Sequence, residues 1–264
     1  MFSSIFKRAK KNVFIHIPKS GGSTFVGLLK DSIKINDSQK KTPTHLIESI
    51  GNIDIKHVDF KKIGRPFKAP EIFDENKKDN YKRKYNLFML VRNPVDRISS
   101  EFTFQFHILN GKNGNSNAAI ISRLIPIPRS LSEYIKHPET QDYQCKFLLG
   151  RKIADPEPIT EIEFKTLIKA IDELPIYCGT TDAYSSFLNL FQETTSIRLN
   201  SKITIRKKSP KEYKENIGEK LKQRIIELNH YDKKLYDYVK NLVKEQNSRS
   251  TNEYNFFDPE EFVV

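Results

Sequence analysis

The sequence predicts an α/β fold with a central, mostly parallel sheet flanked by helices and a helical C-terminal half. Two short apolar runs, residues 12–17 (NVFIHI) and 86–91 (NLFMLV), have the composition of strands buried in a parallel sheet. Each run is followed by turn residues and then by apolar residues at helical spacing. The 264 residues are 37% hydrophobic and 30% charged, which is enough apolar material for a core.

The first strand leads through a glycine turn into a helix. The strand stops at Pro18, and beyond Gly22 the apolar residues recur at helical spacing up to Ile33. A second helical piece is expected after Pro43, and residues 53–60 alternate in strand fashion. The first unit therefore has the order strand, glycine turn, helix, strand.

A second strand-to-helix junction follows a long basic stretch. Residues 61–85 show no clear periodicity and are expected to form a loop. Residues 86–91 form the most apolar short run and predict a central strand. After this strand, Asn93 can cap a helix, Pro94 suits its first position, and Asp96 lies in its acid-favouring first turn.

The rest of the chain is predicted to be mainly helical, with one more short buried strand at residues 175–179. Residues 111–117 (GKNGNSN) are expected to form a turn-rich loop. The predicted helices span residues 130–137, 141–149, 160–174, 181–192 and 209–246. We expect one domain over residues 1–247, followed by an acidic and apolar tail over 248–264.

The formal net charge of +12 predicts a basic surface that attracts anions. Nucleic acid, acidic glycans, anionic lipid and phosphorylated small molecules all fit this charge. A lysine-rich, solvated exterior is the structural alternative. Charge alone therefore does not choose the ligand.

The two cysteines, Cys145 and Cys178, stand in apolar contexts, so a disulfide framework or a cysteine-built metal site is not expected. The apolar run near the N-terminus is too short and too late for a signal peptide. No stretch approaches the roughly 18 to 20 apolar residues of a membrane span. We expect a cytoplasmic protein, unless an anchor lies outside this sequence.

Residues 18–24 (PKSGGST) have the composition of an anion-binding turn. A turn that joins a buried parallel strand to a helix leaves backbone N–H groups unpaired at the positive end of the helix dipole. Gly21 and Gly22 let the backbone turn tightly and approach an anion, and Lys19 adds a positive charge. The pattern is not a Walker A motif, because Lys19 precedes the glycines. An ordinary strand-to-helix turn is the structural alternative.

The second junction, residues 91–100 (VRNPVDRISS), carries a similar set of groups. Arg92 lies at the strand end, and Arg97 and Ser100 are three residues apart, as neighbours on one helical face. The planar guanidinium group of arginine suits a phosphate monoester. Two such junctions at strand carboxyl ends predict a ligand with two separated phosphates.

The two motifs together resemble those of the sulfotransferases that use 3′-phosphoadenosine 5′-phosphosulfate, especially the carbohydrate group that includes heparan sulfate 2-O-sulfotransferase. HIPKSGGST resembles that family's 5′-phosphosulfate loop, and LVRNPVDRISSEF resembles its 3′-phosphate motif. Three later stretches, DYQCKFLLG, YCGTTDAYSSFLNLF and LNHYDKKLYDYV, resemble further family segments in the right order. The resemblance covers residues 12–243 and implies a P-loop-NTPase-like, three-layer fold.

The chain departs from the family pattern at several positions. Ser20 and Ser23 replace commoner threonines and keep the hydroxyl group. Asn93 replaces Asp, and Asp142 stands where the family has Asn. Asp182 replaces the Glu of a Thr-Glu pair, which weakens any role assigned to that position.

The resemblance implies in-line transfer of a sulfuryl group to an acceptor hydroxyl, with release of adenosine 3′,5′-bisphosphate and without a metal. The implied acceptor is a carbohydrate, either an oligosaccharide, a polysaccharide or a glycolipid, and anionic acceptors are included; nucleic acid is not expected as a partner. Lys19 is assigned to the leaving-group oxygen. The implied donor-binding residues are Lys19, Ser20, Gly21, Gly22, Ser23, Thr24, Arg92, Ser100, Arg206 and Lys207. For Arg206 and Lys207, plain solvation is an equal alternative.

The acceptor hydroxyl needs a base, and histidine can take a proton at neutral pH. His57 ends the predicted second strand, and KHVDFKKIG resembles the family segment that carries the catalytic histidine. His45 is the rival, and a carboxylate stays open. A hydrogen-bonded structural histidine is the alternative for both, and His16, inside the first strand, is expected to be structural.

Two other functions stay open at this point. A small-molecule kinase with a non-standard loop would need Mg²⁺ and ATP, for which the sequence offers neither a Walker A lysine nor a metal-binding Asp at the second junction. A non-enzymatic, basic module that binds polyanions would depend steeply on salt and would not need Lys19. The sequence makes no prediction of the oligomeric state.

Overall fold

The computed structural model describes residues 10–33, 49–50, 53–56, 84–109, 129–151, 154–200 and 217–249. Several predicted segments lie wholly or mostly outside these residues: the helical piece after Pro43 (44–50), the loops at 61–85 and 111–117, and most of the tail. Two described ends differ from the prediction: Ser49 and Ile50 form a strand and no helix, and Tyr85 begins a strand. The boundary of the domain at residue 247 stays a prediction. The last described helix continues past it to Arg249.

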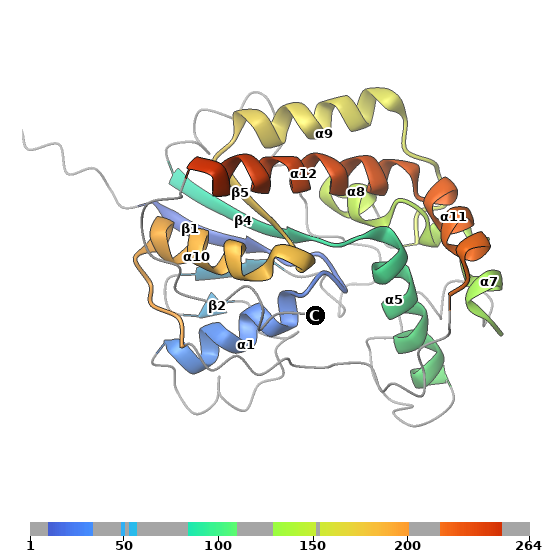
Figure 1. Ribbon diagram of the computed structural model, residues 1–264, viewed down its shortest axis with the longest axis horizontal. Coiled ribbons are helices and arrows are strands. Elements are labelled where there is room, and N and C mark those ends of the chain that lie inside the picture. The colour runs from blue at the N-terminus through green and yellow to red at the C-terminus, as the bar shows by residue number, and fades with distance from the viewer. Residues whose placement is uncertain are drawn as a thin grey trace, which may run out of the picture.

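A five-stranded sheet forms the centre of the molecule, in the order β2-β3-β1-β4-β5 (Figure 1). Strands β1, β3, β4 and β5 are parallel, and β2 pairs antiparallel with β3. The strands span β1 Lys11–Ile15, β2 Ser49–Ile50, β3 Ile53–Lys56, β4 Tyr85–Val91 and β5 Ile176–Thr180. The apolar runs at 12–17 and 86–91 thus form inner strands of the sheet, and the run at 175–179 forms an edge strand.

Helices follow the strands and make up most of the second half. They span α1 Gly22–Ser32, α5 Pro94–Leu109, α7 Leu131–Tyr134, α8 Tyr143–Leu148, α9 Glu161–Glu173, α10 Tyr184–Thr195, α11 Glu219–Leu228 and α12 His230–Arg249, with 3₁₀ turns η3 Pro138–Thr140 and η4 Thr181–Ala183. In the described ranges, no helix combines the length and the apolar character needed to cross a membrane.

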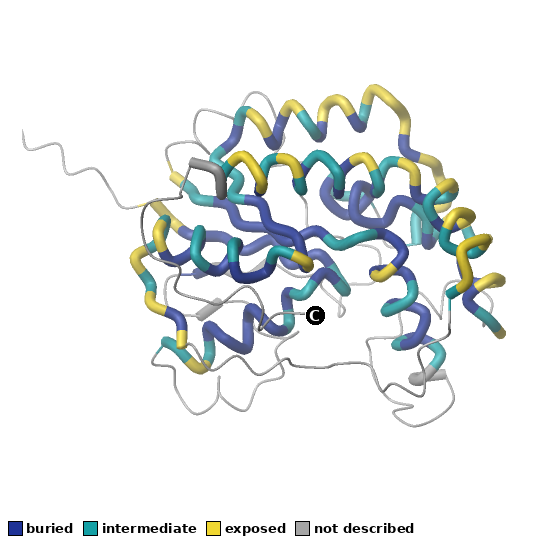
Figure 2. The backbone as a smooth tube through the Cα atoms, viewed as in Figure 1, coloured by how far each residue is buried: buried dark blue, intermediate teal, exposed yellow. Residues whose placement is uncertain are grey.

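Alternating residues of the two central strands pack into two separate hydrophobic cores, because successive side chains of a strand point to opposite faces. Phe14 and Phe88 face α1 and α10, where they pack with Phe25 and other aromatic residues. Ile15 and Met89 face the opposite core. That second core is built with α5, α7, α8, α9, α11 and α12. Figure 2 shows the sheet buried between these two helical layers.

This architecture confirms the predicted α/β class, with its mostly parallel sheet, flanking helices and helical second half. It is consistent with the P-loop-like fold that the resemblance implies. One boundary differs: the helix predicted over residues 209–246 is divided at Asn229. The Asn229 side chain donates to Ile225 O and accepts from the Asp142 backbone, so it ends α11 and joins it to α8.

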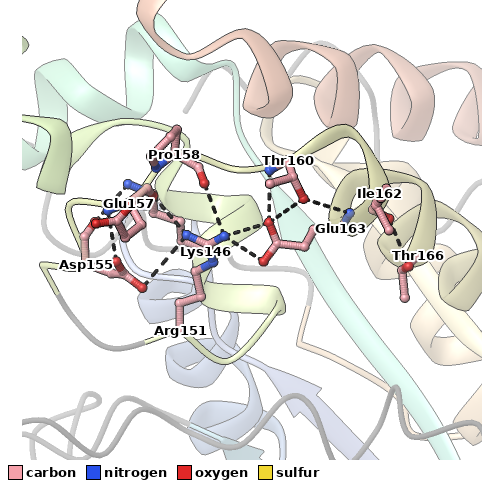
Figure 3. Close-up of polar contacts among 9 residues, drawn as sticks. All are labelled: Lys146, Arg151, Asp155, Glu157, Pro158, Thr160, Ile162, Glu163 and Thr166. Carbon is pink, nitrogen blue, oxygen red and sulfur yellow. Dashed lines mark hydrogen bonds and ion pairs between the residues drawn. The ribbon is translucent and has the colours of Figure 1, made fainter.

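A polar network fixes the connection from α8 to α9 (Figure 3). Arg151 donates to both carboxylate oxygens of Glu163, each at 2.6 Å. Glu163 also accepts from the backbone N–H of Thr160, whose hydroxyl caps the helix in return. The buried ammonium of Lys146 donates to the carbonyls of Pro138 and Asp155, each at 2.8 Å. Together these bonds hold α8, whose first turn lies beside the site described next.

Candidate functional site

The candidate site lies where the chain leaves two neighbouring strands. β1 and β4 are adjacent and parallel, with Ile15 opposite Met89. The chain continues from β1 to β3 on one side of the sheet order, and from β4 to β5 on the other. α1 packs in one core and α5 in the other. Ligands of open α/β sheets bind at such a switch point, outside the carboxyl ends of the strands.

The turn after β1 has an unusual backbone. Lys19 has φ 65° and Gly21 has φ 79°, so left-handed residues stand on either side of Ser20. The N–H of Ser20 donates back to Ile17 O at 3.3 Å and closes the turn. A left-handed lysine is strained, and such strain persists only where the surroundings hold it. Turns of this kind direct backbone N–H groups into a concavity that suits an anion.

The first turn of α1 follows this turn directly. Its N-cap residue is Gly21, no side chain caps it, and no acidic residue stands in the turn. A helix leaves N–H groups unpaired at its start, where its dipole favours negative charge, so an uncapped first turn suits an anion. Ser23 is partly exposed beside them, whereas Thr24 is buried.

The two adjacent positions, 21 and 22, require glycine for two different reasons. Gly21 adopts a positive φ, and Tyr184 closes over it, with the Tyr184 hydroxyl donating to Gly21 O at 3.1 Å. Gly22 has no space for a side chain, because an added Cβ would lie 2.0 Å from Cδ2 of the His16 ring. His16 is buried, as expected for a structural residue, and its ring occupies the volume that a side chain at Gly22 would need.

Arg92 connects the second junction to the first. It follows β4 directly, and its Nη1 donates to Lys19 O at 3.3 Å. Burial lowers the pKa of the Arg92 guanidinium, and the nearby carboxylate of Asp96 opposes this shift. The structure therefore brings Lys19 and Arg92 together at one edge of the sheet.

A third segment, α8, joins both junctions through the side chain of Gln144. Its Oε1 accepts from Ser20 Oγ at 3.1 Å and from the Arg92 N–H at 2.9 Å. Its Nε2 donates to Arg92 O at 2.9 Å. Ser20, which the resemblance places among the residues that bind the sulfate donor, thus donates its hydroxyl hydrogen to Gln144 in this structure. Sequence reasoning gave Gln144 no role, although the stretch that contains it resembles a family segment.

The geometry agrees with a comparison with known protein families, which matches residues 3–239 to the sulfotransferase family. The match covers most of the 264 residues and includes both junctions. The chain belongs to the sulfotransferase family. A search of curated protein sequences found no significant match.

Phe104 is a neighbour of Lys19 that sequence reasoning missed. The ammonium of Lys19 lies 3.9 Å from the centre of the Phe104 ring, a favourable cation–π distance. Phe104 stands four residues after Ser100 on α5, so both share one helical face. Their spacing was visible in the sequence, but the contact with Lys19 depends on the fold.

Arg97 lies three residues before Ser100 on α5, as expected, but its side chain is buried. It is 1% exposed, and its guanidinium lies 4.7 Å from the centre of the Tyr143 ring. None of its three guanidinium nitrogens hydrogen-bonds to a described residue. Positions three apart differ by about 60° around a helix, and here the core boundary passes between them. Arg97 therefore belongs to the interior of the sulfotransferase.

Two buried carboxylates lie behind Gln144. Asp232 of α12 accepts from the backbone N–H groups of Gln144 at 3.0 Å and Cys145 at 2.8 Å, which caps α8. Asp142 accepts from the Asp232 N–H at 2.9 Å. Burial, and then the charge of Asp232, raise the pKa of Asp142 to about 7. Asp142 also has a left-handed backbone, with φ 46°.

Four of the predicted site residues, His45, His57, Arg206 and Lys207, lie outside the described residues. The described part of β3 ends at Lys56, which pairs with Ile15 at the carboxyl edge of the sheet. Within the ranges that the structure describes, no group of three His, Cys, Asp or Glu side chains could hold a metal ion.

We predict that Gly22→Ala destabilises the protein by about 1 to 3 kcal/mol, because the new methyl group would overlap the His16 ring. Urea unfolding measures the loss. Adding His16→Ala should recover part of it, because the two residues are in contact. Gly218→Ala is the control: no atom lies within 4 Å of its Cβ, and we expect a loss below about 1 kcal/mol. Equal losses at both glycines would contradict the packing argument.

Asp142→Asn should change how stability depends on pH. The folded protein holds the Asp142 proton more tightly than the unfolded chain, since the pKa is raised from 3.8 to about 7. This contribution is complete below the unfolded pKa and is lost as the pH rises toward 7. Asn keeps the acceptor for the Asp232 N–H and tolerates the left-handed backbone.

We therefore expect the wild type to lose roughly 2 kcal/mol relative to Asp142→Asn between pH 5 and 7, as measured by urea unfolding. The variant should be the more stable protein at pH 8. Asp31→Asn, which removes an exposed carboxylate on α1, is the control and should follow the wild type. A constant difference between wild type and Asp142→Asn across this range would contradict the raised pKa.

Proposed function

We propose that this chain transfers the sulfuryl group of 3′-phosphoadenosine 5′-phosphosulfate to a hydroxyl group of a carbohydrate acceptor. The observation that carries the proposal is the meeting of two anion-binding turns at one switch point, with Arg92 of the second bonded to Lys19 O of the first. Membership of the sulfotransferase family supports sulfuryl transfer. The resemblance of both motifs to the carbohydrate group supports the choice of donor and acceptor.

The residues present fit the two ends of such a donor. The uncapped first turn of α1, with the left-handed Lys19 and Gly21 before it, suits the 5′-phosphosulfate. Arg92 and Ser100 would hold the 3′-phosphate, because guanidinium and hydroxyl groups both donate to phosphate oxygens. A 3′-phosphate contact distinguishes this donor from ATP and ADP, which lack that group.

In the proposed reaction, the acceptor oxygen forms a bond to sulfur as the bond between sulfur and the phosphate oxygen breaks. Negative charge then develops on the leaving 5′-phosphate. Lys19 and the N-terminus of α1 would stabilise that charge without further reorganisation, because the fold already fixes both. The acceptor's proton passes to a base, and adenosine 3′,5′-bisphosphate leaves.

We assign the base to His57 first, with His45 as the rival and a carboxylate as the third choice. Histidine is the residue whose ordinary pKa, about 6.5, lets it accept a proton near neutral pH. His57 follows β3 in the sequence after Lys56, and β3 is parallel to β1. The KHVDFKKIG resemblance supports the same choice.

A cytoplasmic location is part of the proposal. Both Cys145 and Cys178 are free and buried, which fits a reducing compartment. Burial raises the pKa of Cys178 to about 12, so this thiol stays protonated. The net charge of +12 suits an acidic acceptor or donor, whose approach it would favour.

We expect adenosine 3′,5′-bisphosphate to raise the melting temperature far more than ADP does at equal concentration, because only the first carries a 3′-phosphate. Arg92→Ala should remove most of this preference, and Lys19→Ala should abolish sulfuryl transfer. Differential scanning fluorimetry with each nucleotide measures the binding, with Arg198→Ala as a surface arginine control. Equal shifts for both nucleotides in the wild type would refute the proposed donor, and a Mg²⁺-dependent preference for ATP would favour a kinase.

His57→Ala should lower the rate of transfer to a glycan acceptor by about 10²-fold or more, the usual contribution of a general base, while leaving nucleotide affinity within about threefold. His45→Ala is the matched control and should change the rate little. The assay measures transfer of labelled sulfate from the donor to a panel of glycans across pH 5.5 to 8.5. If His45→Ala causes the larger loss, the roles of the two histidines are reversed.

A further inference from the structure

Gln144 is a buried residue whose side-chain amide hydrogen-bonds with residues of both junctions and with Asp232. It is 0% exposed, although it lies on α8, far in sequence from both turns. Oε1 accepts from Ser20 Oγ and the Arg92 N–H. Nε2 donates to Arg92 O at 2.9 Å and to Asp232 Oδ2 at 3.4 Å.

The orientation of this amide is dictated by its neighbours. The Arg92 N–H can only donate, so it must face the amide oxygen. The Arg92 carbonyl and the Asp232 carboxylate can only accept, so they must face the amide nitrogen. Reversing the amide would place like groups against each other on both sides, and Gln144 is therefore held in one rotamer and one orientation.

The bonds of Gln144 fix the position of one turn relative to the other. Ser20 lies inside the turn after β1, between the two left-handed residues. Arg92 is the first residue after β4, and both its backbone N–H and its carbonyl bond to the same amide. A change in the separation of the two turns would break at least one of these buried hydrogen bonds, and an unmade buried bond is costly.

Gln144 is in turn anchored from α12. Asp232 is fully buried and accepts from the Gln144 backbone as well as from its side chain. This carboxylate fixes the first turn of α8, and with it the base of the Gln144 side chain. The contact network thus runs from α12 through α8 to both junctions.

We infer that Gln144 is a positioning residue that sets the spacing between the two phosphate-binding turns, and so confers selectivity for a nucleotide that carries phosphates at both ends. The inference rests on the proposed function, which assigns the turns to the two phosphates. A ligand that binds two subsites at once gains affinity only when their separation matches its own. A ligand with a single phosphate does not depend on that separation.

The test compares three nucleotides: adenosine 3′,5′-bisphosphate, AMP and adenosine 3′-monophosphate. Gln144→Met keeps the length of the side chain and removes all of its hydrogen bonds. We expect the preference for the bisphosphate over the better monophosphate to fall about tenfold or more, while each monophosphate keeps its affinity within about threefold. Isothermal titration calorimetry measures all three dissociation constants.

Gln192→Met is the matched control. Gln192 is a buried amide on α10 whose Oε1 accepts from the Leu199 N–H at 2.7 Å. Loss of this hydrogen bond should lower the stability of the protein without changing the ratio of nucleotide affinities. Ser20→Ala supplies a milder variant, because it removes one of the bonds to Gln144 and leaves those to Arg92. For Ser20→Ala we expect a smaller fall in the ratio of nucleotide affinities. This variant keeps the inference testable if Gln144→Met does not fold.

Two different negative results are distinguishable. If the wild type prefers the bisphosphate and the Gln144 and Ser20 variants keep the same ratio, Gln144 is only a structural residue and the inference is wrong. If the wild type binds the bisphosphate no better than the monophosphates, the proposed function fails and the inference fails with it.

Discussion

The parallel pairing of β1 with β4 is the interaction on which the rest of the site depends. Neighbouring strands lie about 4.8 Å apart, so the turns that follow them must lie side by side. α1 and α5 then pack in different cores, so the chain diverges from this edge to opposite faces of the sheet. Sheet pairing thus converts two motifs about 70 residues apart into one site.

Packing behind the turns holds them in a conformation that the backbone alone would not favour. The His16 ring fills the space beside Gly22, and Tyr184 closes over Gly21. Gln144 bonds to both turns, and Lys19 keeps a left-handed backbone within this frame. The surrounding core therefore stabilises a strained turn directly before the N-terminus of α1.

Local patterns in the sequence were sufficient for the four parallel strands, for most helices and for the two turns, because strand and helix periodicity and turn composition are short-range signals. The two-residue strand Ser49–Ile50 was missed, because its residues were assigned to a helix. The contacts of Gln144 with Ser20 and Arg92 span 124 and 52 residues, and no local pattern encodes them. The burial of Arg97 was missed for the same reason, since its partner Tyr143 lies on another helix. The break at Asn229 depends on a bond to Asp142, which lies 87 residues away in the sequence.

The most direct measurement is a crystal structure of the protein with adenosine 3′,5′-bisphosphate. The account predicts the 5′-phosphate at the first turn of α1, against the N–H groups that follow Gly21, and the 3′-phosphate within hydrogen-bonding distance of Arg92 and Ser100. A nucleotide bound away from the β1–β4 edge, or bound there with its 3′-phosphate contacting neither residue, would contradict it.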